Sequence, residues 1–293
     1  MNRKLRNILK CYLELSKLKI MIPVSLTGFT GYFMFDPHFK LQILIFTVGI
    51  LILAISASVL NQIQEVELDS KMKRTQDRPI PSGKITLQHA LIVFCVTLIT
   101  GFSFIYSAGN ITSVLIGLLT IIWYNGVYTY SKRITAFAVV PGAITGALPP
   151  VMGWVAAGGG VWDKPIIFVG FLFFTAQVPH FWLLISKYGE EYEKAGYPSL
   201  TGILTGSQIY RLTFTWIVTS VTSAIFLCLF GIIQSGLLMI ILVLVSAVLI
   251  WQFSGILKKP LDRNNLSKYS ILFDSYFLLV LLLLISDRLI FSG

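Results

Sequence analysis

The sequence predicts an all-α, polytopic membrane protein. Of its 293 residues, 55% are hydrophobic and only 12% are charged, and the mean hydropathy is +0.79. Soluble domains typically have about 25% charged residues, so this chain has too few polar groups to cover a water-soluble globule. Its apolar residues are also gathered into long stretches, and about 20 such residues in a helix cross the roughly 30 Å hydrocarbon layer of a bilayer.

Nine apolar stretches follow one another along the chain. They must be helices, because an isolated strand would leave its backbone N–H and C=O groups unpaired in lipid, and they lack the alternation of barrel strands. No polar interval is long enough for a soluble domain, so we expect residues 1–293 to form one integral-membrane domain. The predicted spans are 18–35, 41–60, 87–107, 111–130, 134–157, 166–186, 212–232, 235–256 and 270–290.

The basic residues predict the orientation. When alternate loops are assigned to opposite sides, 20 of the 23 Lys and Arg residues fall on one side, and only Lys40, Lys164 and Arg288 fall on the other. The positive-inside rule then predicts a cytoplasmic N terminus and an external C terminus. Topology and the anionic headgroups of membrane lipids account for the net charge of +10, so we expect no nucleic-acid partner.

The first long polar loop follows the second predicted span directly. Asn61, Glu65 and Asp69 are spaced i, i+4, i+8, which on one helix of about 3.6 residues per turn places all three on one face. Such oxygen donors suit Mg²⁺, which is typically held by one or two carboxylates together with substrate phosphates. Arg74 and Arg78 add guanidinium groups suited to phosphate oxygens. The alternative is a solvated interfacial helix whose charges only form i,i+4 pairs.

A second acid-and-base cluster lies in the loop after the sixth predicted span, on the same predicted side. There, Lys187 and Glu191 are again four residues apart. Two such clusters that face one aqueous boundary can hold one polyanion between them. A metal-bound diphosphate with an apolar tail fits this arrangement, with its head in a polar mouth and its tail between the helices.

Four segments, in order along the chain, resemble one family. The stretch "NQIQEVELDSKMKRTQDRP" resembles the NxxxDxxxDxxMxRTxxRP signature of the intramembrane UbiA-type prenyltransferases, in their protoheme IX farnesyltransferase branch. Similarity to the YTxxKRxTPxNxxxGxxxGAxPPxxGW, QxPHFW and KxxDYxxAGxPML segments of that branch is carried by "YTYSKRITAFAVVPGAITGALPPVMGW", "QVPHFW" and "KYGEEYEKAGYPSL". The resemblance covers most of the chain and implies nine helices around a central chamber.

The sequence departs from the family pattern at four positions. Glu65 and Glu191 stand where the family usually has Asp, and Ala136 and Ala138 replace a Pro and an Asn. Glu still ligates Mg²⁺, although its longer arm shifts the metal or the helix. Relatives that prenylate 4-hydroxybenzoate or quinone precursors commonly show NDxxDxxxD and a second DxxxD. Neither motif is present here, so the resemblance favours the haem branch.

The resemblance implies a Mg²⁺-dependent enzyme that transfers farnesyl from farnesyl diphosphate to a vinyl group of haem B (protoheme IX), giving haem O. An apolar, aromatic-rich chamber then keeps the allylic cation from bulk water. A bacterial or archaeal cell membrane is implied as the location, and haem A synthase or a terminal-oxidase assembly as protein partners. The implied catalytic residues are Asn61, Glu65, Asp69, Lys187 and Glu191, the Mg²⁺ ligands are Asn61, Glu65, Asp69 and Glu191, and the substrate-binding residues are Arg74, Arg78, Lys132, Arg133, Tyr128, His180 and Tyr188.

One histidine and two prolines leave alternatives open. His180 lies inside the sixth predicted span, where a polar ring usually has a partner or a role, so it either ligates haem iron or hydrogen-bonds a neighbour. Asp274 in the ninth span is expected to pair with a cation. Pro149 and Pro150 can break a helix, as in transporters, so a membrane transporter is the alternative of another class. A prenyltransferase for a quinone precursor such as 4-hydroxybenzoate is the alternative enzyme.

Overall fold

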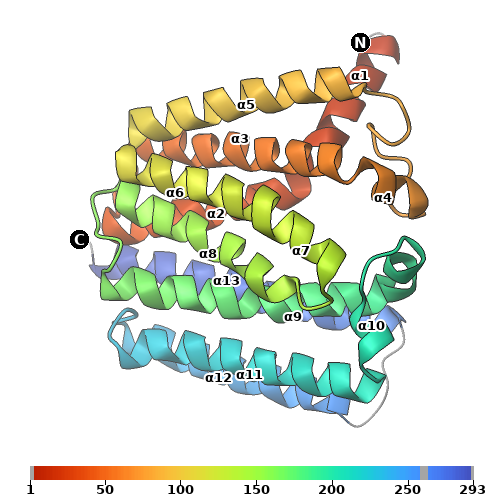
Figure 1. Cartoon of the computed structure of the whole chain (residues 1–293). Coiled ribbons are helices and arrows are strands. Elements are labelled where there is room, and N and C mark those ends of the chain that lie inside the picture. Colours follow the sequence, from red (N-terminus) through yellow and green to blue (C-terminus); the bar gives the residue numbers. More distant parts are fainter. Residues whose placement is uncertain (1–2, 258–262, 292–293) are drawn as a thin grey trace.

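Long helices that run side by side build the whole molecule (Figure 1). The computed structural model describes residues 3–257 and 263–291. Within this described part, nine helical segments are long and apolar enough to span a membrane, which confirms the predicted all-α class and number of spans. The elements are α1 (Arg3–Ser16), α2 (Leu18–Phe35), α3 (Leu41–Gln64), α4 (Val66–Lys71), α5 (Leu87–Ala108), α6 (Ile111–Ile121), the π-helix η1 (Ile122–Tyr128), α7 (Thr129–Ile134), α8 (Val139–Ala156), α9 (Lys164–Lys194), α10 (Leu200–Ile203), α11 (Gly206–Leu229), α12 (Gly236–Ser254), the 3₁₀-helix η2 (Gly255–Leu257) and α13 (Arg263–Phe291).

Some spans differ from prediction at their ends or inside. The fourth span consists of α6, η1 and α7 in succession, because a π-helical turn lies within it. The sixth span belongs to α9, which continues to Lys194, beyond its predicted end at 186. Helix α8 runs through Pro149 and Pro150 without a break. The interrupted helix expected of a transporter is therefore wrong at this position.

Small residues allow α2 and α8 to pack closely. A Cβ on Gly31 would lie 1.9 Å from the carbonyl oxygen of Pro150, and a Cβ on Gly153 would lie 1.9 Å from that of Gly28. Any larger side chain would push the two helices apart. Such contacts are typical in lipid, where helices associate through close packing and not through the hydrophobic effect. The pair forms a wall that continues into α3 on one side and α9 on the other.

The two ends of the bundle carry different elements. Figure 1 shows the N terminus, α4 and α10 at one end, and the C terminus with the loops after α8 and α11 at the opposite end. Both predicted acid-and-base clusters lie at the first end, as the alternation of loops requires. Between the ends, the helices expose apolar side chains; Ile92, Val96 and Ile99 of α5 are 58–67% exposed. An apolar surface of this kind fits lipid, as expected for an integral membrane protein.

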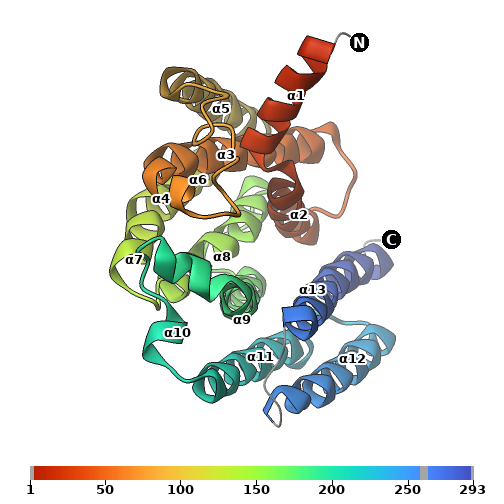
Figure 2. The ribbon, with the colours of Figure 1, turned by 90° about the vertical axis from the view of Figure 1, so that its right-hand side faces the viewer.

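The view onto the end with α4 and α10 shows how the helices are grouped (Figure 2). Helix α5 lies outside α3, and α11 and α13 pack against α9 on the side away from α8. Helices α2, α3, α8 and α9 thus stand between these outer layers. The candidate site lies among these four helices.

Candidate active site

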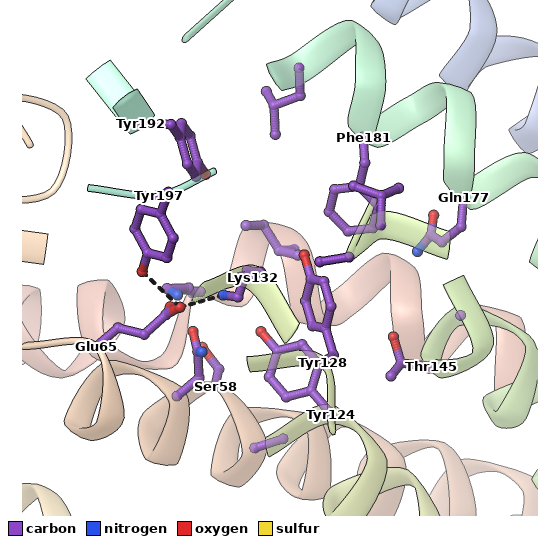
Figure 3. A pocket seen from close by; sticks show the side chains of 18 of the residues that line it. Ser58, Glu65, Tyr124, Tyr128, Lys132, Thr145, Gln177, Phe181, Tyr192 and Tyr197 are labelled. Atoms are coloured by element: carbon purple, nitrogen blue, oxygen red, sulfur yellow. Dashed lines mark hydrogen bonds and ion pairs between the residues drawn. The ribbon is translucent and has the colours of Figure 1, made fainter. Parts of the chain in front are cut away.

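A cavity of about 290 Å³ opens among α2, α3, α8, α9 and the fourth span, at the end of the bundle that carries α4 and α10 (Figure 3). Charged and phenolic side chains line its mouth, whereas apolar ones such as Val24, Ala57 and Phe181 line its deeper part. A few polar groups above an apolar interior are the usual composition of a small-molecule site. The charged residues that line the cavity are Lys17, Glu65, Asp69, Arg74, Arg78 and Lys132.

The three oxygen donors of the first loop face this cavity, but they do not lie on one continuous helix. Helix α3 ends at Gln64, and Glu65 has φ −104° and ψ 10° before α4 begins. The Glu65 N–H still donates to the Asn61 carbonyl at 3.0 Å, and the Asp69 N–H donates to the Glu65 carbonyl at 2.8 Å. The prediction of a single helix is wrong. These two bonds keep the helical spacing across the break, so the three side chains still share one face.

Glu65 lies at the centre of the mouth. Its Oε1 is 2.5 Å from Lys132 Nζ and accepts a hydrogen bond from the Tyr197 hydroxyl at 3.0 Å (Figure 3). Burial raises the pKa of Glu65, but the charge of Lys132 and the hydrogen bonds from Lys132 and Tyr197 outweigh burial, so the pKa lies below its ordinary value. Burial and the charge of Glu65 raise the pKa of Tyr197. At neutral pH, Glu65 is therefore an anion and Tyr197 a hydrogen-bond donor.

Asp69 pairs with a cation of the same loop. Arg78 Nη1 lies 2.6 Å from Asp69 Oδ2, with the Asp69 side chain 2% exposed and that of Arg78 23% exposed. The chain returns to Asp69 because α4 ends at Lys71 and a series of turns follows. The Thr75 hydroxyl stabilises these turns by donating to the Asp69 carbonyl at 2.8 Å. Arg78 thus reaches the cavity from a loop and not from a helix.

Arg74 joins the two predicted clusters. Its Nη2 donates to the Tyr192 hydroxyl oxygen at 3.0 Å, and its backbone N–H donates to Glu191 Oε2 at 3.4 Å. Its guanidinium carbon also lies 5.1 Å from the centre of the Tyr188 ring, within the range of a cation–π contact. The first loop and the end of α9 therefore meet, as the sequence predicts, and Glu191 and Tyr188 adjoin the mouth through Arg74.

Besides Glu191 and Tyr188, which adjoin the mouth, two further predicted residues do not line the cavity. Arg133 donates to the Gln64 carbonyl at 2.5 Å and so caps the end of α3. His180 lies between α9 and α13, with its Nδ1 2.6 Å from Asp274 Oδ1. This contact is the hydrogen-bonding neighbour considered for His180, and it makes an imidazole the partner of Asp274, where the sequence predicts a cation. The side chain of Lys187 lies outside the described residues.

The polar residues of the cavity that are absent from the predicted set include Lys17, Tyr124, Tyr192 and Tyr197. Tyr192 and Tyr197 belong to the fourth motif segment, so their place in that motif is a usable signal. Lys17 has no comparable signal, because it reaches the cavity through a left-handed backbone conformation, φ 46° and ψ 41°, between α1 and α2. Burial and the nearby charge of Arg78 lower the pKa of Lys17 to about 7.

The cavity lining has an excess of cations, with four Lys or Arg residues against two carboxylates. A polyanion would balance this excess. Among the described residues, no group of three His, Cys, Asp or Glu side chains converges on one point. The donors present, two carboxylates and the Asn61 amide, nevertheless suit Mg²⁺, because Mg²⁺ usually takes one or two carboxylates and completes its shell with substrate phosphates and water.

Sequence comparison gives this site a family context. The model of the UbiA prenyltransferase family matches residues 23–281. A protoheme IX farnesyltransferase of Oleidesulfovibrio alaskensis is 31% identical over 286 residues, which are 98% of this chain and 99% of that protein. A protoheme IX farnesyltransferase of Geobacter sulfurreducens is 40% identical over 186 residues, which are 62% of this chain and 67% of that protein.

Solved structures of low sequence identity share the fold. A digeranylgeranylglyceryl phosphate synthase matches with a TM-score of 0.76 at 22% identity, covering 96% of this chain and 98% of that one. A UbiA homologue from Archaeoglobus fulgidus, bound to GPP and Mg²⁺, matches with a TM-score of 0.64 at 15% identity, covering 92% and 99%. With the family model matched over residues 23–281 and a relative aligned along nearly its whole length, the chain belongs to the UbiA prenyltransferase family.

Proposed function

We propose that this protein transfers the farnesyl group of farnesyl diphosphate to a vinyl group of haem B, giving haem O, with Mg²⁺ as cofactor. The observation that carries the proposal is the cavity, whose charged mouth opens into an apolar interior. A prenyl diphosphate has the matching form, an anionic head on an apolar chain. The relatives aligned above, which are protoheme IX farnesyltransferases, support haem B as the acceptor.

In this proposal the mouth binds the diphosphate. Arg74, Arg78 and Lys132 are the predicted cations that line it, and Lys17 adds a further basic side chain. Preorganised cations stabilise the negative charge that develops on a leaving group in the transition state. The residues that would hold Mg²⁺ are Asn61, Glu65 and Asp69 in the lining and Glu191 beside Arg74. Bound Mg²⁺ supplies further stabilisation of charge on the departing oxygens.

The reaction balances as a substitution followed by addition of water. The allylic carbon–oxygen bond of farnesyl diphosphate breaks, and its electron pair leaves with the diphosphate. The terminal vinyl carbon bonds to the allylic carbon, which leaves positive charge on the vinyl carbon next to the porphyrin. Water adds its oxygen there and releases one proton, which completes a hydroxyethylfarnesyl group.

Aromatic side chains suit the passage of the allylic cation. Below the charged mouth, the ring centres of Tyr124 and Tyr128 lie 5.6 Å apart, and those of Tyr128 and Phe181 lie 6.2 Å apart (Figure 3). Aromatic faces attract cations, and an enclosed apolar site keeps water from a reactive intermediate. Tyr128 therefore acts in substrate binding, whereas Tyr188 acts through its contact with Arg74.

The two remaining predicted haem contacts lie outside the cavity and on different sides of it, with His180 of α9 facing α13 and Arg133 of α7 at the end of α3. His180 uses its Nδ1 on Asp274, an arrangement that orients the imidazole and presents Nε2 to iron. Arg133 stays a predicted contact of the diphosphate or of a haem propionate. Lys187 stays a predicted contact of the diphosphate.

We further propose that the mouth faces the cytoplasm of a bacterial or archaeal cell, with the C terminus outside. Cysteines introduced at the exposed positions Ser70 and Lys194 should react only with a reagent added from the cytoplasmic side. A cysteine at Trp162, which is 85% exposed in the loop after α8, should react only from outside. Labelling of these positions from the opposite sides would show that the topology is the reverse of the one proposed. Association with haem A synthase or a terminal-oxidase assembly stays a prediction.

The deciding experiment uses purified full-length protein with labelled farnesyl diphosphate. Haem B and 4-hydroxybenzoate are offered separately, with Mg²⁺ present or chelated. We expect label in haem only, and only with Mg²⁺. Label in 4-hydroxybenzoate would support the quinone-precursor alternative, and label in neither acceptor, despite binding of farnesyl diphosphate, would overturn the proposed reaction.

A further inference from the structure

Thr129 begins α7 directly after the π-helical turn, and it is fully buried. Its Oγ1 lies 2.9 Å from the carbonyl oxygen of Tyr124 and 3.0 Å from Nδ2 of Asn61. A carbonyl oxygen only accepts hydrogen bonds, so the single hydroxyl proton of Thr129 goes to Tyr124. The Thr129 oxygen therefore accepts a hydrogen bond from the amide Nδ2 of Asn61.

This chain of two hydrogen bonds determines which way the Asn61 amide points. The oxygen and nitrogen of an amide have nearly the same shape, and the hydrogen-bond network decides between them. The Asn61 side chain lines the cavity, and its Nδ2 is held by Thr129. Its Oδ1 therefore occupies the other position of the amide. We propose that Thr129 is a positioning residue that presents the oxygen of Asn61, and not its amino group, to bound Mg²⁺ and diphosphate. The inference deepens the proposed function and rests on its metal site.

The π-helical turn makes this geometry possible. The Thr129 N–H donates to the Tyr124 carbonyl, five residues earlier, whereas a regular α-helix would join it to Asn125. The Asn125 carbonyl is thereby released and accepts a hydrogen bond from Gln64 Nε2 at 3.2 Å. Asn125 Nδ2 also donates to the Ala57 carbonyl at 3.0 Å. These hydrogen bonds hold the turn against α3 near Asn61, and they thereby fix the distance between Thr129 and Asn61. Single π-turns of this kind often occur at functional sites.

The test removes the acceptor while keeping a branched side chain. Losing the outer partner of a metal ligand typically lowers metal affinity by about 10–100-fold. We therefore expect Thr129→Val to weaken Mn²⁺ binding by about tenfold or more in the presence of inorganic diphosphate, as measured from the EPR signal of free Mn²⁺. The Mg²⁺ concentration that half-saturates transfer should rise by a similar factor. Thr129→Ser keeps the hydroxyl and should stay within about twofold of wild type.

Two controls separate positioning from a general loss of structure. Ser131→Ala removes a hydroxyl of the same helix that donates to the Val127 carbonyl at 2.7 Å, and metal binding should change by less than about twofold. In the Asn61→Asp background the side chain carries two equivalent oxygens and needs no orientation. Adding Thr129→Val to that background should therefore change Mn²⁺ binding by less than about twofold. The proposal would be overturned if Thr129→Ser and Thr129→Val lost the same Mn²⁺ affinity. It would also be overturned if Thr129→Val lost as much Mn²⁺ affinity in the Asn61→Asp background as in wild type.

The outcome also separates this inference from the proposed reaction. Mn²⁺ with inorganic diphosphate involves neither haem nor a farnesyl chain. If wild type fails to farnesylate haem but Thr129→Val lowers Mn²⁺ affinity as expected, only the proposed acceptor is wrong. If Thr129→Val binds Mn²⁺ as wild type does, the role of Thr129 is wrong while the proposed reaction stands.

Discussion

Replacing Asp69 by Asn tests whether the first loop is a metal and diphosphate site or a solvated interfacial helix. The change removes one negative charge and keeps the size of the side chain and one of its two oxygens. Asp69 is 2% exposed, and its Oδ2 lies 2.6 Å from Arg78 Nη1. The variant therefore leaves the neighbouring cations opposed by Glu65 alone in the cavity lining, and it removes one of the three carboxylates proposed for Mg²⁺.

The expected magnitudes follow from this burial and pairing. Loss of a preorganised electrostatic group typically lowers kcat by about 10²–10³-fold, or about 2.7–4 kcal/mol, and we expect Asp69→Asn to fall in this range. A hydrogen bond to a charged partner contributes about 1.5–3 kcal/mol to stability. The 23% exposure of Arg78 places the stability loss at the lower end of that interval, because water solvates the released guanidinium in part. Most of the protein should stay folded, since typical stabilities are about 5–15 kcal/mol.

The assay is a Mg²⁺ titration of labelled farnesyl transfer, with thermal unfolding measured in parallel. Glu67→Gln is the matched control, because Glu67 is exposed at the surface of α4 and does not line the cavity. We expect Asp69→Asn to raise the half-saturating Mg²⁺ concentration and lower the maximal rate, while Glu67→Gln stays within about twofold. A similar loss in both variants, or full activity of Asp69→Asn, would refute the site and support the interfacial-helix alternative.

Three further predictions concern other residues of the site. Tyr197→Phe removes the hydrogen bond to Glu65 and should lower kcat/KM for farnesyl diphosphate by about tenfold or more, since such a bond contributes about 1.5–3 kcal/mol; unchanged kinetics would contradict this. The depressed pKa of Glu65 stabilises the fold above its ordinary value of 4.5, and this contribution is lost as the pH falls through the folded-state pKa, so the melting temperatures of wild type and Glu65→Gln should converge below that pH; a gap that widens on acidification would contradict the sign. His180→Ala and Asp274→Asn should both weaken haem binding, followed by absorbance titration, while leaving farnesyl diphosphate binding intact; equal loss of both ligands would indicate a structural role.

Local patterns in the sequence were sufficient for part of the site. The spacing of Asn61, Glu65 and Asp69 predicts a shared face because helical hydrogen bonds join residues four apart, and those bonds persist even where Glu65 leaves helical geometry. The first loop also points to Arg78, and the motif resemblance adds Lys132; these two residues contact Asp69 and Glu65 respectively. No local rule predicts the break in the helix, because it depends on where the turns after α4 return to the chain.

The sequence predicted that the two polar loops meet, but the individual contacts between distant segments lay beyond sequence reasoning. Arg74 meets Tyr192 and Glu191 from the end of α9, and Tyr197 reaches Glu65 across 132 positions of the chain. Lys17 enters the cavity through one left-handed residue between two helices. The spacing of polar and apolar residues along the sequence does not predict these contacts, because they depend on how whole helices pack.

Composition and hydropathy by themselves determined that this protein is an all-α membrane protein of nine spans. Lipid leaves the backbone no alternative to internal hydrogen bonding, and span length follows from bilayer thickness. The tertiary structure decided which side chains share the cavity. It placed Lys17 and Tyr197 inside and turned Arg133 to the end of α3. It also paired His180 with Asp274. Each of these outcomes depends on the relative rotation and depth of packed helices, which close contacts such as that between Gly31 and Pro150 set.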